Sequence, residues 1–211
     1  MVEAQITQSY NGIESVITYN DPEHIKHVRL TKNWHEIHML DHIARLGKMD
    51  GDILDVGANV GQHSVFFATH CTSGYVYAYE PNAESFMVLS KNKHVNKLEN
   101  IFPFLCAIGK KGKGYIVDKE GRSGTCEVER GKGEVEIFEP PIHENKISLI
   151  KIDVEGMELE VLEVLSGNLE KWHPEIYVET HNNLKEVKSF LSKFGYQMWG
   201  VFNNAPTYWF R

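Results

Sequence analysis

The most constraining feature of the sequence is a regular alternation of strand and helix patterns from residue 52 almost to the end. Short apolar runs alternate with longer runs whose apolar residues have helical spacing. Such alternation is typical of a parallel sheet with helices on both faces. The predicted strands are DILDV (52–56), YVYAYE (75–80), IFPFLCAI (101–108), SLIKID (148–153) and EIYVET (175–180), and the predicted helices are VFFATH (65–70), AESFMVLSKNKHV (83–95), MELEVLEVLSGNLEKW (157–172) and LKEVKSFLSKF (184–194).

The two ends of the chain depart from this alternation. YQMWGVF (196–202) and PTYWF (206–210) are joined by NNA, which predicts a hairpin and therefore an antiparallel closing strand. Before residue 33 the chain is polar, with a weak strand signal around ESVITY, and a helix is predicted from Asn33 to Leu46. The interval from Gly109 to Gly133 holds seven glycines and seven Lys or Arg residues, which predicts loops and a small hairpin. We therefore expect one domain over residues 1–211, with an N-terminal cap segment (1–48) and a Rossmann-like core (50–211) that carries a loop insertion at 109–147.

The totals restrict the class of protein. A chain of 211 residues suits one domain, and its net charge of −7 argues against broad contact with nucleic acid, which needs a basic face. Cys71, Cys106 and Cys126 lie far apart without a CxxC motif, which predicts reduced thiols. The N-terminus lacks the features of a signal peptide, and no apolar run approaches the roughly 20 residues of a membrane span. We expect a cytoplasmic protein with no nucleic-acid partner and no membrane span.

The segment DILDVGANVGQH (52–63) is the most informative about a ligand. Gly57 follows a strand and Gly61 opens a helix, and glycine lets backbone approach a ligand at the carboxyl edge of a sheet. A dinucleotide-binding enzyme would show G-x-G-x-x-G, whereas this chain shows G-x-x-x-G. Asp55 at the strand end would repel a pyrophosphate but would suit a ligand that carries an ammonium and a sulfonium. S-adenosylmethionine is such a ligand.

The next strand ends add to this cofactor site. Glu80 lies 25 residues after Asp55, a spacing at which an acid commonly hydrogen-bonds ribose hydroxyls, although Glu80 alone is also compatible with NAD. Cys106 and Ala107 at the end of the third strand are candidates for packing against an adenine, and an ordinary buried strand end is the alternative. Residues beside the turn glycine and the ribose acid complete the cofactor-binding candidates, namely Ala58, Asn59 and Pro81.

Several segments together resemble the FkbM-type methyltransferases, namely DVGANVG, YEPN, CAIG, SGT, IKIDVEGMELEVL and PEIYVETH. The resemblance runs from about Asp50 to His181. It implies a seven-stranded class I methyltransferase fold with a reversed last strand, S-adenosylmethionine as methyl donor, and O-methylation of sugar or polyketide hydroxyls. It also implies that Asp55, Gly57 and Gly61 match the loop at the methionine side of the cofactor. Glu80 matches the acid at the ribose of the cofactor, and Ser123 belongs to a small-residue motif near the cofactor.

Acids gather where the fourth and fifth strands end. Methyl transfer to an alcohol needs alignment of the reactants and a group that takes up the acceptor's proton. The two strands are normally adjacent in this fold, so their acids and His181 are expected to converge. His181 is then a general base held by a carboxylate, or Asp153, Glu179 and His181 bind Mg²⁺ or Mn²⁺, or the cluster is structural. The predicted catalytic residues are Asp153, Glu155, Glu179 and His181, with Asp153 also counted among the cofactor-binding residues.

Helical spacing divides the remaining acids after residue 157. Glu158 falls in the apolar arc of the first turn and is expected to support the site, whereas Glu160 and Glu163 face solvent. His63 is expected on a helix surface. The predicted acceptor is a small molecule or glycan. The alternatives are a peptide, lipid or nucleic-acid acceptor, or a catalytically silent module that binds S-adenosylmethionine.

Overall fold

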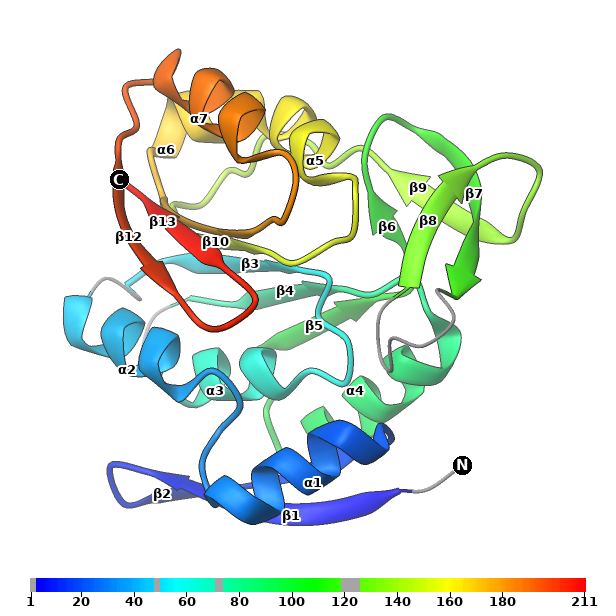
Figure 1. Ribbon diagram of the computed structural model, residues 1–211, viewed down its shortest axis with the longest axis vertical. Helices are drawn as coiled ribbons and strands as arrows, with labels where there is room; N and C mark the ends of the chain where they lie inside the picture. Colours follow the sequence, from blue (N-terminus) through cyan, green and yellow to red (C-terminus); the bar gives the residue numbers. More distant parts are fainter. Residues whose placement is uncertain (1–2, 48–49, 71–73, 119–125) are drawn as a thin grey trace.

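A seven-stranded sheet forms the middle layer of the computed structural model, which describes residues 3–47, 50–70, 74–118 and 126–211 (Figure 1). The strands lie in the order β12-β13-β11-β10-β3-β4-β5. Neighbours from β11 to β5 pair in parallel, and β13 is antiparallel to both β11 and β12. The strands are β3 (Asp52–Val56), β4 (Val76–Tyr79), β5 (Ile101–Phe104), β10 (Ile147–Ile152), β11 (Glu175–Glu179), β12 (Met198–Phe202) and β13 (Thr207–Phe210).

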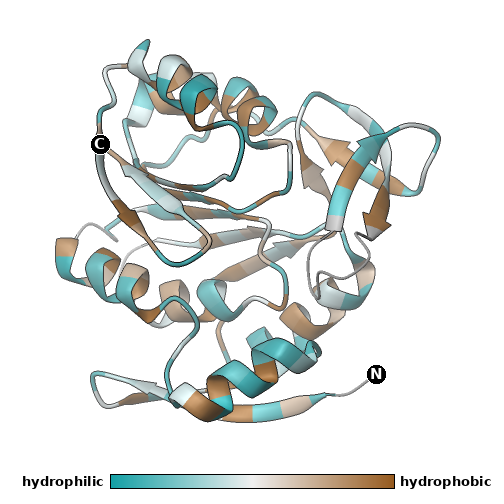
Figure 2. Cartoon of the chain, viewed as in Figure 1, coloured by the Kyte–Doolittle hydropathy of each residue, from teal (hydrophilic) through white to brown (hydrophobic). Residues whose placement is uncertain are grey.

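Helices cover both faces of this sheet (Figure 1). On one face lie α2 (Ile37–Leu46), α3 (Gln62–His70) and α4 (Ala83–Val95), and on the other α5 (Glu158–Val164), α6 (Ser166–Trp172) and α7 (Leu184–Ser192). Because both faces are covered, every residue of β3 and β10 is buried, including the charged residues Asp52, Asp55 and Lys151. In Figure 2 the central strands are largely hydrophobic, while the helices alternate hydrophobic and hydrophilic positions.

The N-terminal segment is more ordered than the sequence indicated. β1 (Ala4–Tyr10) and β2 (Ile13–Tyr19) form an antiparallel hairpin, and α1 (Pro22–Thr31) follows. The sequence prediction missed α1, although Asp21 caps it by accepting from the His24 amide at 2.8 Å and Pro22 occupies its first turn. The predicted helix from Asn33 begins only at Ile37.

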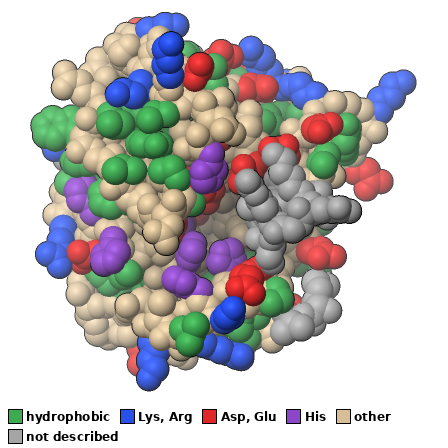
Figure 3. Space-filling model, in the orientation of Figure 1, with side chains coloured by type: hydrophobic (Ala, Val, Ile, Leu, Met, Phe, Trp, Pro, Cys, Tyr) green, Lys and Arg blue, Asp and Glu red, His purple; other side chains and the backbone are tan. Residues whose placement is uncertain are grey.

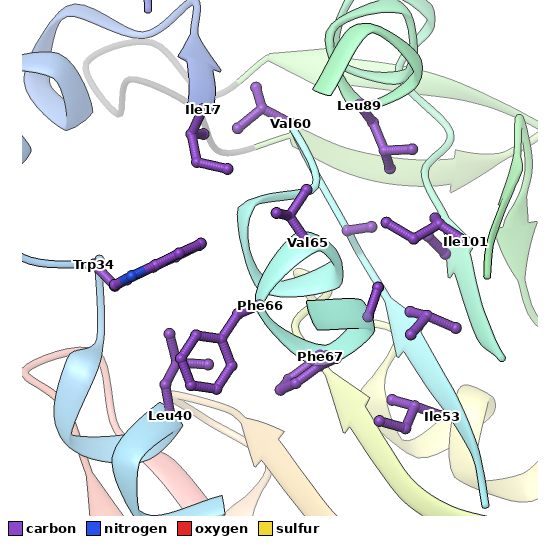
Figure 4. Packing of buried hydrophobic residues seen from close by; sticks show 14 of the residues in the cluster. Ile17, Trp34, Leu40, Ile53, Val60, Val65, Phe66, Phe67, Leu89 and Ile101 are labelled. Atoms are coloured by element: carbon purple, nitrogen blue, oxygen red, sulfur yellow. The ribbon is translucent and has the colours of Figure 1, made fainter. Parts of the chain in front are cut away.

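The chain between α1 and α2 packs onto the sheet layer. Trp34 is buried, and Figure 4 shows its ring and Leu40 beside Phe66 of α3. The Trp34 and Phe66 rings meet edge to face with their centroids 5.4 Å apart. On the other side of the hairpin, the Thr18 amide donates to the Asn92 side chain of α4 at 2.7 Å. His35 is bound to the start of α3, because its amide donates to the Gln62 side chain at 3.2 Å and its carbonyl oxygen accepts from that side chain at 3.1 Å.

A second sheet replaces the loops expected at 109–147. It comprises β6 (Ala107–Ile108), β7 (Gly112–Asp118), β8 (Cys126–Arg130) and β9 (Val135–Phe138) in the order β6-β9-β7-β8. The predicted hairpin is present as β7–β8. The prediction of one strand over 101–108 was wrong, because the chain leaves the large sheet after Phe104 and pairs again at Ala107 with β9.

The acids of α5 tie this small sheet to the large one. Glu160 accepts from the Lys110 amide at 2.7 Å and contacts Arg130, and Glu163 pairs with the Lys110 ammonium at 2.9 Å. These two acids therefore anchor a neighbouring element, whereas the sequence assigned them to solvent. Glu158 is buried, as its place in the apolar arc predicts, and accepts from the Gly156 amide at 3.3 Å. The single helix predicted over 157–172 is two helices that meet at Leu165.

Candidate active site

Four strands of the large sheet end in register at one edge. Val56 of β3 pairs with Tyr79 of β4 and with Ile152 of β10, and Ile152 pairs with Val178 of β11. Parallel strands place their carboxyl ends at the same edge, where ligands of open α/β sheets bind. The residues that follow these aligned positions therefore form one row, composed of Gly57, Glu80, Asp153 and Glu179.

A cavity of about 270 Å³ lies along this row, and a smaller one of about 70 Å³ adjoins it around Gly57 and Asn59. In Figure 3 this face is hollowed near its centre, and histidine side chains gather around the hollow. The walls come from the loops after β3, β4, β10 and β11, from the small sheet, and from the N-terminal segment. Predicted site residues that line the larger cavity are Gly57, Asn59, Glu80, Pro81, Cys106, Ala107, Asp153, Glu155 and Glu179.

Glu80 is buried and its carboxylate is held by backbone. One oxygen accepts from the Asn59 amide at 2.7 Å and the other from the Asn82 amide at 2.8 Å. Burial raises the pKa of Glu80 to about 7, against the lowering effect of these two hydrogen bonds. Each oxygen keeps a further lone pair, so the carboxylate can also accept from hydroxyl groups in the cavity.

Asp55 lies beneath the row and does not line either cavity. Its side chain is fully buried, accepts from the Ser64 hydroxyl at 2.5 Å and approaches the Lys151 ammonium at 3.5 Å. The expectation of direct ligand contact for Asp55 is therefore corrected to a buried ion pair below the site. Lys151 also donates to Asp153 at 3.0 Å. Burial lowers the pKa of Lys151, but the carboxylates of Asp153, Asp55 and Glu36 outweigh it and hold that pKa above its usual range.

The two motif glycines serve packing. Gly57 has φ +79°, and a Cβ there would overlap the Asp153 carbonyl oxygen, so glycine lets the β3 turn sit against the end of β10. Gly61 has φ +76°, and a Cβ would lie 2.7 Å from Leu89 Cγ of α4. Gly61 lines neither cavity. Gly57 lines the cavity, so close approach of a ligand to its backbone stays a prediction. Gly61 instead allows contact with α4.

The acceptor side of the cavity is rich in carboxyl groups. Glu179 at the end of β11 is partly buried, with 16% of its side chain exposed, and its pKa is raised to about 8 by desolvation and by the charges of Asp153, Glu36 and Glu155. His181 has 43% of its side chain exposed and does not line the cavity, and its Nε2 lies 3.8 Å from Glu179 Oε1. The predicted convergence of Asp153, Glu155 and Glu179 is present, while His181 reaches the cavity only through Glu179.

Three further groups face this region from outside the predicted set. Glu36 and His35, in the N-terminal segment, line the larger cavity, and His63 of α3 lines the smaller one. Burial lowers the pKa of His35 to about 4 and holds that of His63 well below its usual range, so both imidazoles are neutral at pH 7. The expectation that His63 lies on a helix surface was wrong, because residues 34–36 cover it.

The far end of the cavity is apolar. Tyr79, Ile108 and Val128 line it beside Cys106 and Ala107. Cys106 is a free, buried thiol, and burial raises its pKa to about 11, so it packs against neighbours as a neutral group. A flat heterocycle would find hydrophobic walls here. Ser123, predicted near the cofactor, lies outside the described residues.

The model of the methyltransferase FkbM domain matches residues 55–198 of this chain. The chain belongs to the FkbM methyltransferase family. The match begins at the buried Asp55 and includes all four residues of the row, so the family's shared region contains the strand ends that line the cavity.

Relatives of this FkbM-family chain support the same fold. It is similar to the hexuronic acid methyltransferase AglP of Haloferax volcanii, with 29% identity over 160 residues, which cover 68% of this chain and 63% of that protein. Among solved structures it is similar to an FkbM methyltransferase from Methylobacillus flagellatus KT, with a TM-score of 0.55 and 16% identity over 77% of this chain and 44% of the other. It is also similar to a tRNA m1G37 methyltransferase of M. jannaschii, with a TM-score of 0.56 and 16% identity over 98% of this chain and 56% of the other. At 16% identity the two structures are evidence of the fold alone and do not show what this chain acts on. The expectation that it has no nucleic-acid partner therefore stays a prediction.

Two other expectations for this FkbM-family chain concern a metal ion and a membrane. Within residues 3–47, 50–70, 74–118 and 126–211, no three His, Cys, Asp or Glu side chains are grouped so that they could hold a metal ion. The geometry therefore gives no support to Mg²⁺ or Mn²⁺ at Asp153, Glu179 and His181. The same described ranges contain no helix with the length and apolar character needed to cross a bilayer.

Sequence reasoning missed Lys151, Glu36 and His63. Lys151 carried a usable signal, because a charged residue that interrupts the buried run LIKID needs a buried partner, and Asp55 pairs with it in register on the next strand. Glu36 and His63 carried a weaker one. Their burial depends on how the N-terminal segment packs over α3, which the local pattern of residues 33–46 does not encode.

Proposed function

We propose that this chain is an S-adenosylmethionine-dependent O-methyltransferase that methylates a hydroxyl group of a sugar or glycan. The observation that carries the proposal is the row of Gly57, Glu80, Asp153 and Glu179 along one cavity, in a chain of the FkbM family. The name of the similar hexuronic acid methyltransferase supports a sugar as the acceptor.

The residues along the row fit the proposed cofactor from end to end. Glu80 has lone pairs free for two ribose hydroxyls, and the apolar pocket at Cys106 and Ala107 suits an adenine. The turn at Gly57 and Asn59 leads into the smaller cavity, which suits the methionine end. Asp153 lies between these parts and the acceptor side, where a carboxylate favours the positive charge of a sulfonium.

The cofactor, when bound, supplies a methyl group activated by a sulfonium, so the protein needs no nucleophile of its own. The chain must hold the acceptor hydroxyl in line and accept its proton. Asp153, Glu155 and Glu179 offer carboxyl oxygens to the hydroxyls of a sugar, and His181 contributes through Glu179. A raised pKa lets Glu179 donate as well as accept hydrogen bonds near neutral pH.

The test begins with binding. Calorimetric titration should show that the wild-type protein binds S-adenosylmethionine and its demethylated product and has no preference for NAD. Methyl transfer is then assayed with mass detection on simple sugars, nucleotide sugars and oligosaccharides, with a peptide and a lipid panel beside them. Glu170→Gln, an exposed position on α6, is the matched control for cavity substitutions.

The results separate the alternatives. Failure to bind either form of the cofactor refutes every methyltransferase function for this chain. Binding with transfer only to the peptide or lipid panel refutes the sugar acceptor, and binding without transfer to any panel indicates a silent binding module. Full activity after treatment with a chelator excludes a required metal ion.

A further inference from the structure

Glu36 occupies an unusual backbone position at the cavity wall. It directly precedes α2, with φ 58° and ψ 33°, and its side chain makes no capping hydrogen bond to that helix. A left-handed conformation costs a residue other than glycine about 1–2 kcal/mol. The conformation instead directs the carboxyl group into the cavity, where only 7% of the side chain is exposed. Strained backbone of this kind is concentrated at functional sites.

A buried histidine stands behind this carboxyl group. His63 Nε2 lies 3.4 Å from Glu36 Oε2, and 8% of the His63 side chain is exposed. Among the described residues, His63 Nε2 has no hydrogen-bond partner of good geometry, so it is a buried polar atom whose nearest acid is Glu36. A neutral imidazole nitrogen can donate to a carboxylate or accept from a carboxylic acid, according to its tautomer. It can therefore hold Glu36 in either protonation state.

Two of the predicted bases are engaged elsewhere or lie outside the cavity, whereas Glu155 and Glu179 line it together with Glu36. Asp153 accepts from the Lys151 ammonium at 3.0 Å, so one of its oxygens is already engaged. His181 lies outside the cavity. Glu36 has no such short cationic contact among the described residues.

The charges around Glu36 keep its carboxyl group poised near neutrality. Burial and the charges of Asp153 and Asp55 raise its pKa, Lys151 lowers it, and together they bring it to about 7. A general base works best when its pKa is near the operating pH. The titratable groups that face this cluster from the surrounding elements are His24, His35, His63, Asp55, Lys151, Asp153 and Glu179.

We propose that Glu36 is the catalytic base of this methyl transfer and that His63 is the positioning residue that holds its carboxyl group. The inference rests on the proposed function and adds a residue from the N-terminal segment to it. The acceptor oxygen forms a bond to the methyl carbon as the carbon–sulfur bond breaks and its electron pair stays on sulfur. The hydroxyl proton passes to the Glu36 carboxylate.

A base placed at the reacting methyl must sense the sulfonium charge, and this can be measured without any acceptor. S-adenosylmethionine carries that charge and its demethylated product does not. A nearby cation lowers the pKa of a carboxyl group. A carboxyl group of pKa about 7 is half protonated at pH 7, and a fall of about one unit releases about 0.4 proton.

The experiment is calorimetry at pH 7 in two buffers of different ionisation enthalpy. For the wild type we expect more protons released with S-adenosylmethionine than with its product, and for Glu36→Gln we expect that difference to fall by about 0.4 proton. Affinity for the product should change less than threefold. Glu23→Gln is the matched control, because Glu23 is an exposed acid on α1 of the same segment.

Transfer assays on a sugar that the wild type methylates provide the second readout. We expect Glu36→Gln to lower kcat by about 10²–10⁴-fold and to remove the dependence of kcat on pH near 7. Glu36→Asp, which keeps the carboxyl group, should retain more activity than Glu36→Gln and carries the same test if the amide variant does not fold. His63→Phe should shift the pH profile of kcat, because it removes the nitrogen that faces the Glu36 carboxyl group.

The outcomes separate the two proposals. If neither form of the cofactor binds the wild type, both proposals fail. If both forms bind and Glu36→Gln keeps the full difference in proton release, or if it keeps wild-type kcat, Glu36 is not the base and the proposed function stands without it.

Discussion

Replacing Lys151 by methionine tests the buried charges under the site. Lys151 is 3% exposed, and its ammonium lies 3.5 Å from Asp55 and 3.0 Å from Asp153. At these distances each attraction amounts to about 5 kcal/mol with an effective dielectric constant of about 20, and desolvation of the ammonium offsets much of that sum. Removing one partner of a buried pair leaves the other charge uncompensated and costs about 3–5 kcal/mol. We expect Lys151→Met to lower the free energy of unfolding by about that amount.

The assay is urea unfolding at pH 7, followed by circular dichroism. With a slope of about 2–3 kcal/mol per molar urea, the midpoint should fall by about 1–2 M. Lys188→Met, at an exposed position of α7, is the control and should stay within about 0.5 kcal/mol. Because the folded-state pKa of Lys151 is raised, its stabilisation is fully present below the ordinary lysine value and is lost only as pH rises through the raised one. The gap between wild type and Lys151→Met should therefore persist to about pH 9, and it should widen as pH rises through 7 to 8, because Lys151 also lowers the pKa of Glu36, Glu80 and Glu179.

A double variant checks the cause. Adding Asp55→Asn to Lys151→Met removes a carboxylate charge that has lost its partner and keeps the shape of the side chain. We expect it to recover about 1–2 kcal/mol relative to Lys151→Met alone. An unchanged midpoint in Lys151→Met, or a double variant less stable than Lys151→Met, would refute the view that the ion pair compensates buried charge.

Three other predictions concern the turn, the ribose acid and pH. Gly57→Ala should abolish folding or cost more than about 3 kcal/mol in thermal unfolding, because its Cβ would overlap the Asp153 carbonyl oxygen; Gly12→Ala, with φ +78° and no atom within 4 Å of its Cβ, should lose only about 1 kcal/mol. Glu80→Gln should weaken calorimetric binding of the demethylated cofactor by about 10-fold, because its amide NH₂ cannot accept from the backbone amide that the lost oxygen served. Burial raises the pKa of Glu36 and Glu80 to about 7 and that of Glu179 to about 8, so the folded state binds extra protons up to that range. The stability that these groups contribute should be highest below the ordinary glutamate pKa of about 4.3 and should be lost as pH rises through 7 to 8. The melting temperature should therefore be lower at pH 8.5 than at pH 6, and Glu179→Gln should show a smaller difference.

The strand ends could be predicted from the sequence because they depend on local patterns. A buried run of apolar residues marks each parallel strand, and the first polar residue after it marks the edge of the sheet. Glu80 and Asp153 were placed correctly on that basis, and the adjacency of β10 and β11 is confirmed. Asp55 was expected to contact the ligand because it lies next to the end of a strand. The sequence does not show whether its side chain faces the cavity or the protein interior.

Features that depend on packing between distant segments could not be predicted. In IFPFLCAI the apolar run is continuous, yet β5 ends at Phe104 and β6 of the other sheet starts at Ala107. No polar residue marks the break in the sequence. Glu160 reads as a solvent-facing helix position, and its partner Arg130 lies 30 residues earlier on the small sheet. Such pairs are visible only once the small sheet is known to lie beside α5.

The N-terminal segment brings to the cavity a carboxyl group that the core does not supply. The core alone places acids at the sheet edge, but Asp153 is paired with Lys151, and Asp55 is sealed below. A carboxyl group that is buried, raised in pKa and without a short cationic partner costs stability, and proteins keep such groups mainly at functional sites. Glu36 has these properties, and it is brought to the cavity by Trp34 and Leu40 packing against α3. In the proposed reaction, the segment that lies before the shared family region supplies the carboxyl group that takes up the proton of the acceptor hydroxyl.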